Sequence, residues 1–237
     1  GAFNLESSTP SVPGWFSEFS TFKILWDIFD GANEPNDTVA LGFAPIYTAM
    51  TSAQPSTDSL TGIFPFVRAL KASNAAAAAG VNALLTEHSI VPNVDDFGSN
   101  ETNAGGSVDA LPIYTTIALG GTQQVCGDAA FGNYNKLGNR RFLRLLLAQQ
   151  TTVSIAATGL AGSQASPVPD PDVIVWRRGQ VVAFANAIGN QESLPMAGQA
   201  PLSLAAGTYV IEVFEYSHTD AAEPQRGRTC INVTVTG

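Results

Sequence analysis

The chain contains only two histidines, His88 and His218, that could serve a metal site or an acid–base reaction. A zinc hydrolase needs several histidine or carboxylate ligands that meet at one point, often two histidines four residues apart on a helix. That spacing is absent, since Glu87 directly precedes His88 and adjacent helical residues do not share a face. We interpret His88 as a residue near a helix end, where the helix dipole favours a positive side chain.

His218 has two neighbours that a hydrolase could use. Tyr216 and Asp220 lie close to it in sequence, and a serine hydrolase needs a serine, a histidine and an orienting acid. The Gly-x-Ser-x-Gly turn that exposes the nucleophile of one large hydrolase class does not occur in the sequence. We therefore interpret His218 as a solvated loop residue, and a hydrolase built around it is the third of three hypotheses.

Acidic side chains gather in three short stretches that could supply the oxygen ligands of calcium. The stretches contain Glu34, Asn36 and Asp37; Asp95, Asp96, Asn100 and Glu101; and Asp170 and Asp172. None has the spacing of an EF-hand loop, and each alone is typical of a capped turn. Asp170 and Asp172 are the candidate calcium ligands, and the sequence indicates no other cofactor.

The two cysteines, Cys126 and Cys230, do not have the close spacing of a metal site. They are either two free buried thiols or one disulfide. In the last strand-like run, Ile231, Val233 and Val235 alternate with polar residues, which places Cys230 on the polar face. This placement favours a disulfide, which would stabilise the fold by up to ~4–5 kcal/mol and imply an oxidising compartment.

Charge and hydropathy exclude several classes of partner. The net charge is −9 and only 13% of the residues are charged, against ~25% in ordinary soluble domains. Nucleic-acid binding requires a basic patch, and the basic cluster here is limited to Arg140, Arg141 and Arg144. No run approaches the ~18 apolar residues of a membrane helix. We expect no nucleic-acid partner, no membrane span and a secreted, periplasmic or cell-surface location.

The first ninety residues have helical sequence patterns, and His88 lies near the end of the last of them. The first helix is expected over residues 17–31, with Ser17 as its N-cap and Gly31 after its end. Its apolar side chains recur at helical spacing and are Phe19, Phe22, Leu25, Trp26 and Phe29. Three more helices are expected: one opened by Pro45, one kinked at Pro65, and one alanine-rich helix within residues 74–89.

Short strand-like runs separated by glycine and proline turns follow a polar stretch at residues 91–110. They predict a β-sandwich or jelly roll, and the turn around Gly179 predicts a hairpin in which this glycine has a positive φ. The fold class is therefore α+β, with an N-terminal helical segment followed by a jelly-roll-like antiparallel β-sandwich. We assign residues 1–92 to the helical segment, 93–139 to a linker with a covering strand, and 140–237 to the sandwich.

Residues 142–216 resemble the bacterial pre-peptidase C-terminal domain, a small β-sandwich appended to secreted peptidases. The resemblance is carried by the acidic lead Asp170-Pro171-Asp172 with its following strand, the Arg-Gly-Gln turn, and the run LAAGTYVIEV at 204–213. It implies an accessory role in secretion, in anchoring or in binding insoluble substrate, and it does not imply catalysis.

The first half of the chain is similar to the region that follows the catalytic motifs in a group of bacterial secreted zinc metallopeptidases. Residues 14–50, 56–72 and 134–145 carry this similarity. The zinc-binding helix and the later glutamate ligand of those enzymes lie upstream, and no residue here matches them. The resemblance therefore implies the C-terminal region of such a protein, or a relative that lost its catalytic half.

Two functions compete ahead of the hydrolase hypothesis. The first is a non-catalytic accessory region of a secreted peptidase, whose partner would be the missing N-terminal catalytic region. The second is a stand-alone extracellular sandwich that binds carbohydrate or protein through Trp176, Phe184 and Tyr216, unless these rings belong to the core. A helical segment that normally docks on a partner would also expose part of its apolar face.

Overall fold

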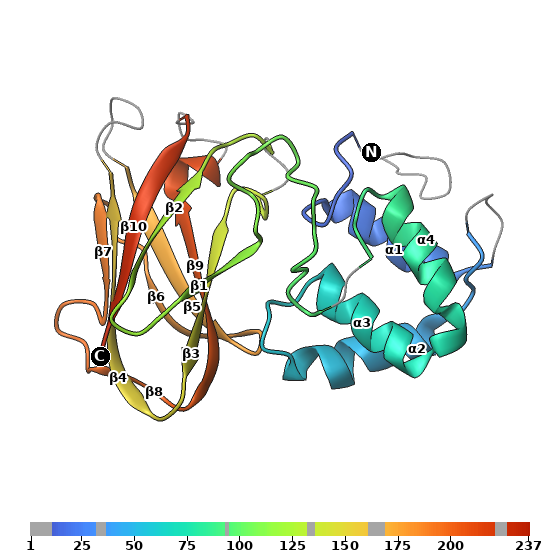
Figure 1. The fold of residues 1–237 in the computed structure, drawn as a ribbon, viewed down its shortest axis with the longest axis horizontal. Coiled ribbons are helices and arrows are strands. Elements are labelled where there is room, and N and C mark those ends of the chain that lie inside the picture. The colour runs from blue at the N-terminus through green and yellow to red at the C-terminus, as the bar shows by residue number, and fades with distance from the viewer. Residues whose placement is uncertain (1–10, 32–36, 93–94, 132–135, 161–168, 221–226) are drawn as a thin grey trace. The chain divides into compact units, whose positions relative to one another are not determined.

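The computed structural model describes residues 11–31, 37–92, 95–131, 136–160, 169–220 and 227–237. The chain divides into two compact units, Gly1–Gly105 and Gly106–Gly237. Within the described residues, the α-helices belong to the first unit and the β-strands belong to the second (Figure 1). This is the α+β class expected from the sequence. None of the described helices is long and apolar enough to cross a membrane.

The helical unit contains four α-helices in its described part. They are α1 Glu18–Phe29, α2 Phe43–Thr48, α3 Ile63–Ser73 and α4 Ala78–Glu87; the π-turn η1 Ala49–Ala53 and the 3-10 turns η2 Gln54–Ser56 and η3 Ala75–Ala77 adjoin them. Ser17 is the N-cap of α1, as expected, and its side chain accepts the N–H of Ser20. The expected kink at Pro65 is wrong. Helix α3 begins at Ile63, so Pro65 lies in the first turn, where its missing N–H removes no helical hydrogen bond.

Helix α1 does not bury the aromatic stripe that its sequence suggests as a core face. Its buried side chains are Ser20, Lys23, Ile24, Asp27 and Ile28. Phe22, Trp26 and Phe29 are exposed instead. Two buried isoleucines supply the apolar contact, and an ion pair of 3.6 Å between Lys23 and Asp27 neutralises the buried charges.

The second unit is a sandwich of two sheets. Its described strands are β1 Tyr114–Ile117, β2 Thr122–Gly127, β3 Arg141–Leu147, β4 Thr151–Gly159, β5 Pro171–Arg177, β6 Gln180–Ala185, β7 Gln191–Leu194, β8 Leu202–Leu204, β9 Gly207–Glu215 and β10 Thr229–Thr236. One sheet has the order β1-β3-β9-β5-β6, and the other has the order β2-β10-β4-β7 with β8 paired to β4. The described pairings are antiparallel except that of β1 with β3, which is parallel.

Alternating apolar side chains of both sheets form the core. In β10, Ile231, Val233 and Val235 point inward, as the sequence pattern predicts, and Val173 and Val175 do the same from β5. The outward positions of β5 are Asp172, Ile174 and Trp176, because successive strand residues point to opposite faces. The core therefore fixes which side chains of β5 are offered on the outer face of its sheet.

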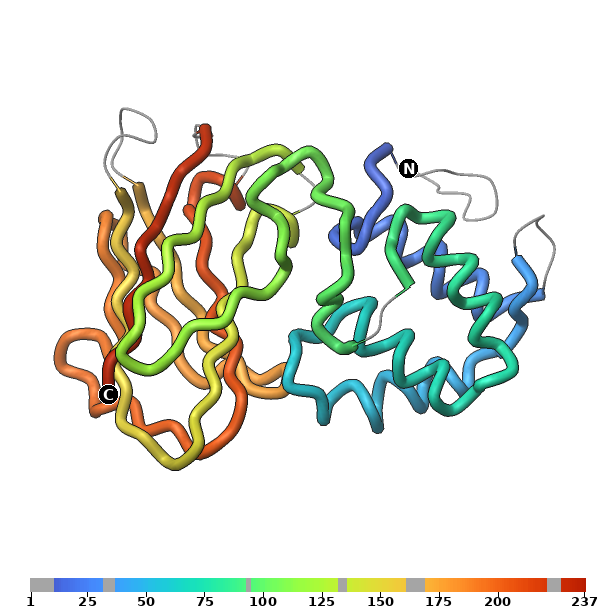
Figure 2. The backbone as a smooth tube through the Cα atoms, viewed as in Figure 1, coloured from blue at the N-terminus to red at the C-terminus, as the bar shows by residue number. Residues whose placement is uncertain are grey.

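A disulfide joins Cys126 and Cys230, as expected from the sequence. The two residues lie directly opposite each other in the pairing of β2 with β10. Segments 104 positions apart in sequence therefore run side by side (Figure 2). The second compact unit begins at residue 106, so it includes β1 and β2 as well as the strands that follow residue 140.

Strands β5 and β6 form a hairpin with a two-residue turn. Arg178 has φ of 50° and Gly179 has φ of 72°, which are the positive angles of the turn that best matches the twist of paired strands. The prediction for Gly179 is confirmed, and Arg178 adopts a conformation that residues other than glycine rarely adopt. This hairpin makes β6 the last strand of its sheet.

Candidate functional site

The three aromatic rings proposed for binding lie along one region of the first sheet. Trp176 is half-buried on β5, and its indole N–H donates to Glu212 of β9 at 2.6 Å. Phe184 of β6 lies opposite Ile174 and is 51% exposed. Tyr216 follows β9 in the 3-10 turn η4 Tyr216–His218 and is 39% exposed.

These rings do not converge on one point. The backbone N–H of Tyr216 donates to the carbonyl of Asp170, just before β5 begins, whereas Trp176 lies near the other end of that strand. Six residues of extended strand span roughly 20 Å. Phe184 lies between these two positions in the register. The arrangement suits an elongated ligand rather than a compact one.

An open groove of about 310 Å³, lined mainly by apolar side chains, lies beside Phe184. Val182 and Phe184 line it from β6, Leu194 from β7, Met196 from the segment after β7, and Leu202 from β8. Gln199 supplies a polar side chain to this lining. We call this feature the β6 groove. One wall comes from β6 and the other from residues 194–202, which only the folded chain brings together. The sequence alone therefore did not indicate the groove.

Strand β6 also presents a backbone edge at this groove. Among the described strands it pairs with β5 alone, so one row of its N–H and C=O groups faces away from the sheet. Its sequence, Gln-Val-Val-Ala-Phe-Ala, contains no charged residue and no proline. Natural edge strands commonly carry such residues to prevent pairing with other chains. A β-bulge at Val182 interrupts this edge, because Val175 pairs with Ala183 and Trp176 pairs with Val181. The regular part of the edge beside the groove, Ala183–Ala185, is therefore the part able to accept an added strand.

On the outer face of the same sheet, charged and polar side chains link neighbouring strands. Arg140 forms an ion pair with Glu212, whose other carboxylate oxygen accepts the Trp176 indole N–H. The Arg140 guanidinium also lies 4.3 Å above the ring of Phe214, a favourable cation–π contact. These contacts join β9 to β5 and to the residue before β3, and they give the outer face a rigid support.

The two acidic residues at the start of β5, Asp170 and Asp172, are part of the packed structure of the sandwich. The N–H of Asp170 donates to Glu215 at 2.8 Å, and the Asp170 carboxylate accepts the N–H of Gly189 at 2.9 Å. Asp172 is 8% exposed. Burial, followed by the nearby charges of Asp170, Glu192 and Glu215, raises the pKa of Asp172 to about 7.

These carboxyl groups do not form an evident calcium site. Among the described residues, no group of three or more histidine, cysteine or acidic side chains is arranged to hold a metal ion. One oxygen of Asp170 is already used by Gly189. The calcium expectation for Asp170 and Asp172 stays a prediction, and no step of the function below depends on it.

Of the other two acidic stretches, the one at residues 95–101 lies wholly within the described part of the chain. Glu34 and Asn36 lie outside the described residues. Asp95 accepts the N–H groups of Phe97 and Ser99, and Asp96 pairs with Arg68 at 3.1 Å. Glu101 accepts the N–H groups of Val91, Thr102 and Asn103. In this stretch the acids cap turns.

His218 is buried rather than solvated, which corrects the sequence interpretation. It is 0% exposed, and a ring nitrogen lies 2.9 Å from the carbonyl of Gly227. The cavity that His218 lines together with Asn139 and Arg141 has a volume of about 10 Å³. That volume holds no more than about one water molecule. The tyrosine and aspartate near His218 in sequence bond to each other, since Tyr216 donates to Asp220 at 2.7 Å. A substrate therefore has no access to this histidine.

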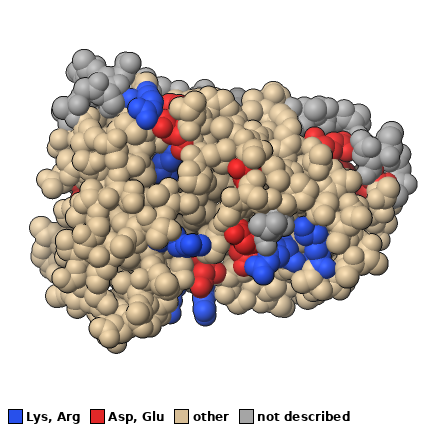
Figure 3. Space-filling model, in the orientation of Figure 1, with Lys and Arg blue, Asp and Glu red and all other residues tan. Residues whose placement is uncertain are grey.

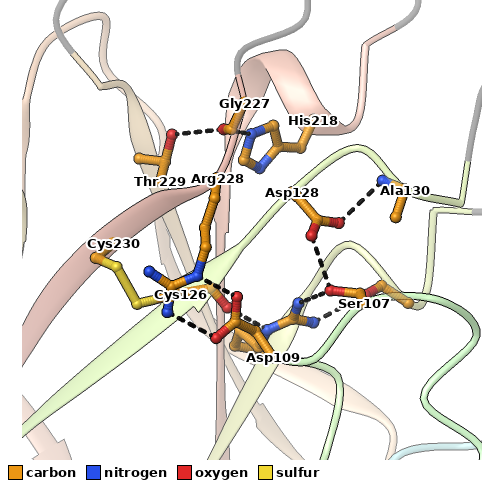
Figure 4. A network of polar contacts seen from close by, with 12 residues as sticks. Ser107, Asp109, Cys126, Asp128, Ala130, His218, Gly227, Arg228, Thr229 and Cys230 are labelled. Atoms are coloured by element: carbon orange, nitrogen blue, oxygen red, sulfur yellow. Dashed lines mark hydrogen bonds and ion pairs between the residues drawn. A yellow bond between two sulfur atoms is a disulfide. The ribbon is translucent and has the colours of Figure 1, made fainter. Parts of the chain in front are cut away.

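Polar contacts around the disulfide fasten the ends of several strands (Figure 4). Arg228 forms a two-pronged pair with Asp109, at 2.6 and 2.9 Å, and Ser107 donates to Asp128 at 3.0 Å. The buried Arg141 donates to the carbonyls of Cys126, Gly138 and Arg140. Burial lowers the pKa of Arg141 to about 10, so it remains a cation at neutral pH. We interpret this network as structural, because its donors are used by backbone and carboxylate groups of the sandwich.

Comparisons with known proteins find likeness in solved structures. No protein-family model matches the chain, and no curated protein matches it. The pre-peptidase C-terminal domain of a collagenase from Bacillus anthracis is similar at 14% identity, with a TM-score of 0.36, over 52% of this chain and 93% of its own. The periplasmic lysozyme inhibitor PliG from Aeromonas hydrophila is similar at 14% identity, with a TM-score of 0.29, over 52% and 96%. TM-scores this low carry no argument about function, and the sandwich described above rests on its own strand pairing.

Proposed function

We propose that this chain is a non-catalytic accessory region of a secreted peptidase and that its sandwich binds an extended segment of a protein substrate along β6. The observation that carries the proposal is the β6 groove beside a strand edge that pairs on one side only among the described strands and carries no charge and no proline. An added strand would hydrogen-bond to the edge, while alternate side chains would enter the groove, a common mode of peptide recognition.

The chemistry of the groove favours polypeptide over polysaccharide. The side chains that line it are mainly aliphatic and aromatic, and the backbone edge of β6 supplies the polar groups that an added strand would pair with. Trp176, which a sugar could stack on, is half-buried and bonded to Glu212. The bound segment would be extended, apolar or neutral, and free of acidic residues, since the chain has a net charge of −9.

The accessory role is supported by the resemblance of residues 142–216 to domains appended to secreted peptidases. A module that holds substrate near a catalytic region raises the effective concentration of scissile bonds without doing chemistry itself. The catalytic region would be the partner of this chain. Secretion is part of the proposal, and the Cys126–Cys230 disulfide supports it because such bonds persist in oxidising compartments.

Retention on immobilised ribonuclease that has been reduced and alkylated, an unfolded polypeptide of net positive charge, tests this function. We expect the full chain to be retained and Phe184→Ser to lower the affinity by about tenfold or more, as loss of a central aromatic contact does. Val182→Lys should have a similar effect by placing a charge at the edge. Leu146→Ser is the matched control, because Leu146 is 70% exposed on β3 of the same sheet, and it should bind normally.

Two results would overturn the proposal. One is equal retention of the unaltered chain, Phe184→Ser and Leu146→Ser, which would place binding elsewhere. The other is retention on insoluble chitin or cellulose without retention on the unfolded ribonuclease. That outcome would support the alternative, a stand-alone extracellular module that binds carbohydrate.

A further inference from the structure

The inverted burial of α1 leaves three aromatic side chains in solvent. Phe22 is 50% exposed, Trp26 is 36% exposed and Phe29 is 42% exposed. The opposite face holds Lys23 and Asp27 in a buried ion pair. Rotating the helix to bury its rings would therefore expose two isoleucines and separate the pair from its surroundings. The exposed stripe is a stable feature of the helical unit.

A second exposed stripe begins where the first one ends. Phe43, Tyr47 and Met50, on α2 and η1, are 64%, 55% and 40% exposed. The backbone N–H of Gly42 donates to the carbonyl of Phe29 at 3.1 Å, which holds the start of α2 beside the end of α1. We call these six side chains the aromatic patch.

The aromatic patch carries almost no charge. Residues 38–57 contain no charged residue, and the exposed charged residue of α1 is Glu18 in its first turn. Although charged groups form a few clusters on the molecular face drawn in Figure 3, uncharged side chains predominate there. Interface centres are depleted of charge and enriched in aromatic residues, as this patch is.

We propose that the aromatic patch binds a second copy of this chain about a two-fold axis. Phe22, Trp26 and Phe29 lie on the exposed face of α1 with spacings of four and three, which is the spacing of a helix–helix seam, and the Phe22–Trp26 pair is the same in both directions. An antiparallel α1 pair would therefore place Phe22 against Trp26 of the partner subunit, and the same contact would occur twice. Such self-complementarity is what a two-fold interface requires.

The area of the patch fits a dimer of moderate affinity. A buried aromatic side chain covers 150–250 Å², so six half-exposed side chains offer roughly 600 Å² per copy. Two copies would then bury roughly 1,200 Å², the lower limit of specific interfaces. We expect a dissociation constant on the order of 10 μM. This inference concerns Gly1–Gly105 and does not rest on the proposed function.

Sedimentation velocity of the full chain from about 1 to 200 μM tests the inference, since this range brackets the expected constant. The unaltered chain should shift from monomer to dimer with rising concentration. Phe22→Ser combined with Trp26→Ser should weaken the dimer at least tenfold. Tyr47→Thr is a milder second variant, and it should weaken the dimer with little risk to folding because its side chain is 55% exposed. Phe184→Ser removes an almost equally exposed ring from the other unit, and it should dimerise normally.

Circular dichroism of each variant would confirm that its helices are retained. A chain that remains monomeric at the highest concentration would overturn the inference. So would a dimer that Phe184→Ser abolishes and the α1 variant leaves intact, because association would then occur through the edge of β6.

Discussion

Asp172 is the residue whose protonation should most affect the sandwich. Burial and the charges of Asp170, Glu192 and Glu215 raise its pKa from 3.8 to about 7. A carboxyl group whose pKa is higher in the folded state stabilises that state only while it is protonated. Its contribution is therefore complete below pH 3.8 and is lost as the pH rises toward 7.

Replacing this carboxyl group should flatten the pH dependence of stability. Asp172→Asn should make the sandwich more stable than the unaltered chain at pH 8, by on the order of 2 kcal/mol, and change it little at pH 4. Urea unfolding at both pH values measures the difference. If the free energy of unfolding of the two proteins changed with pH in the same way, ionisation of Asp172 would not destabilise the folded state, and this prediction would be wrong.

The same carboxyl group gives the sharpest test of the calcium expectation. If Asp170 and Asp172 bind calcium, the ion must compete with the proton on Asp172. Calcium should then raise the unfolding midpoint more at pH 8 than at pH 5, and Asp172→Asn should remove the effect. A midpoint that calcium leaves unchanged at pH 8 would contradict the expectation.

Arg141 should matter more to stability than its charge suggests. It is 7% exposed and donates to the carbonyls of Cys126, Gly138 and Arg140. Arg141→Met leaves these acceptors without their donor and should destabilise the chain by about 2–4 kcal/mol. Arg68→Met is the control, because a surface pair such as Arg68 with Asp96 contributes about 1 kcal/mol or less. Equal losses in urea unfolding would contradict this interpretation of the network.

At the scale of elements, the disulfide should decide how firmly β2 is held. Strand β2 ends the order of its sheet, and its described partner is β10. The bond closes a loop of 104 residues, and loss of such a link commonly costs about 2–5 kcal/mol. Cys126→Ala combined with Cys230→Ala should lower the urea midpoint, and dithiothreitol should then have no further effect. An unchanged midpoint would mean that the β2–β10 pairing is sufficient by itself.

The elements that the sequence predicted are those whose signals are local. The Ser17 cap, the alternation in β10 and the positive φ of Gly179 each depend on a few neighbouring residues. The face that α1 buries depends on tertiary packing, so its aromatic spacing was misleading. A weaker signal was available, because Ser20, Lys23 and Asp27 also recur at helical spacing.

The candidate site was predictable only in part for the same reason. Phe184 was identified because it is a ring near a recognisable turn. The β6 groove was not, since its other wall comes from Leu194, Met196 and Leu202, which only the folded sandwich brings to Phe184. The burial of His218 was also missed, because the residues that cover it lie far away in sequence; Asn139 donates to its carbonyl.

At the scale of the whole molecule, charge should modulate self-association. The net charge is −9 at pH 7 and the isoelectric point is about 4.5. Two copies therefore repel each other at neutral pH, while salt and mild acid reduce the repulsion. The dimer should tighten several-fold between pH 8 and pH 5.5 at low salt, and the change should shrink in about 0.5 M sodium chloride. Sedimentation under these four conditions checks this, and a dimer that is tightest at pH 8 in low salt would contradict it.

Amide hydrogen exchange of the full chain, with and without soluble ribonuclease that has been reduced and alkylated, decides whether an extended polypeptide binds along β6. We expect slower exchange in Gln180–Ala185, because the outward N–H groups of this edge strand would acquire acceptors. Thr151–Gly159 should be unaffected, since β4 already pairs with β10 on one side and with β7 and β8 on the other. Protection at another surface, with unchanged exchange in β6, would contradict the account.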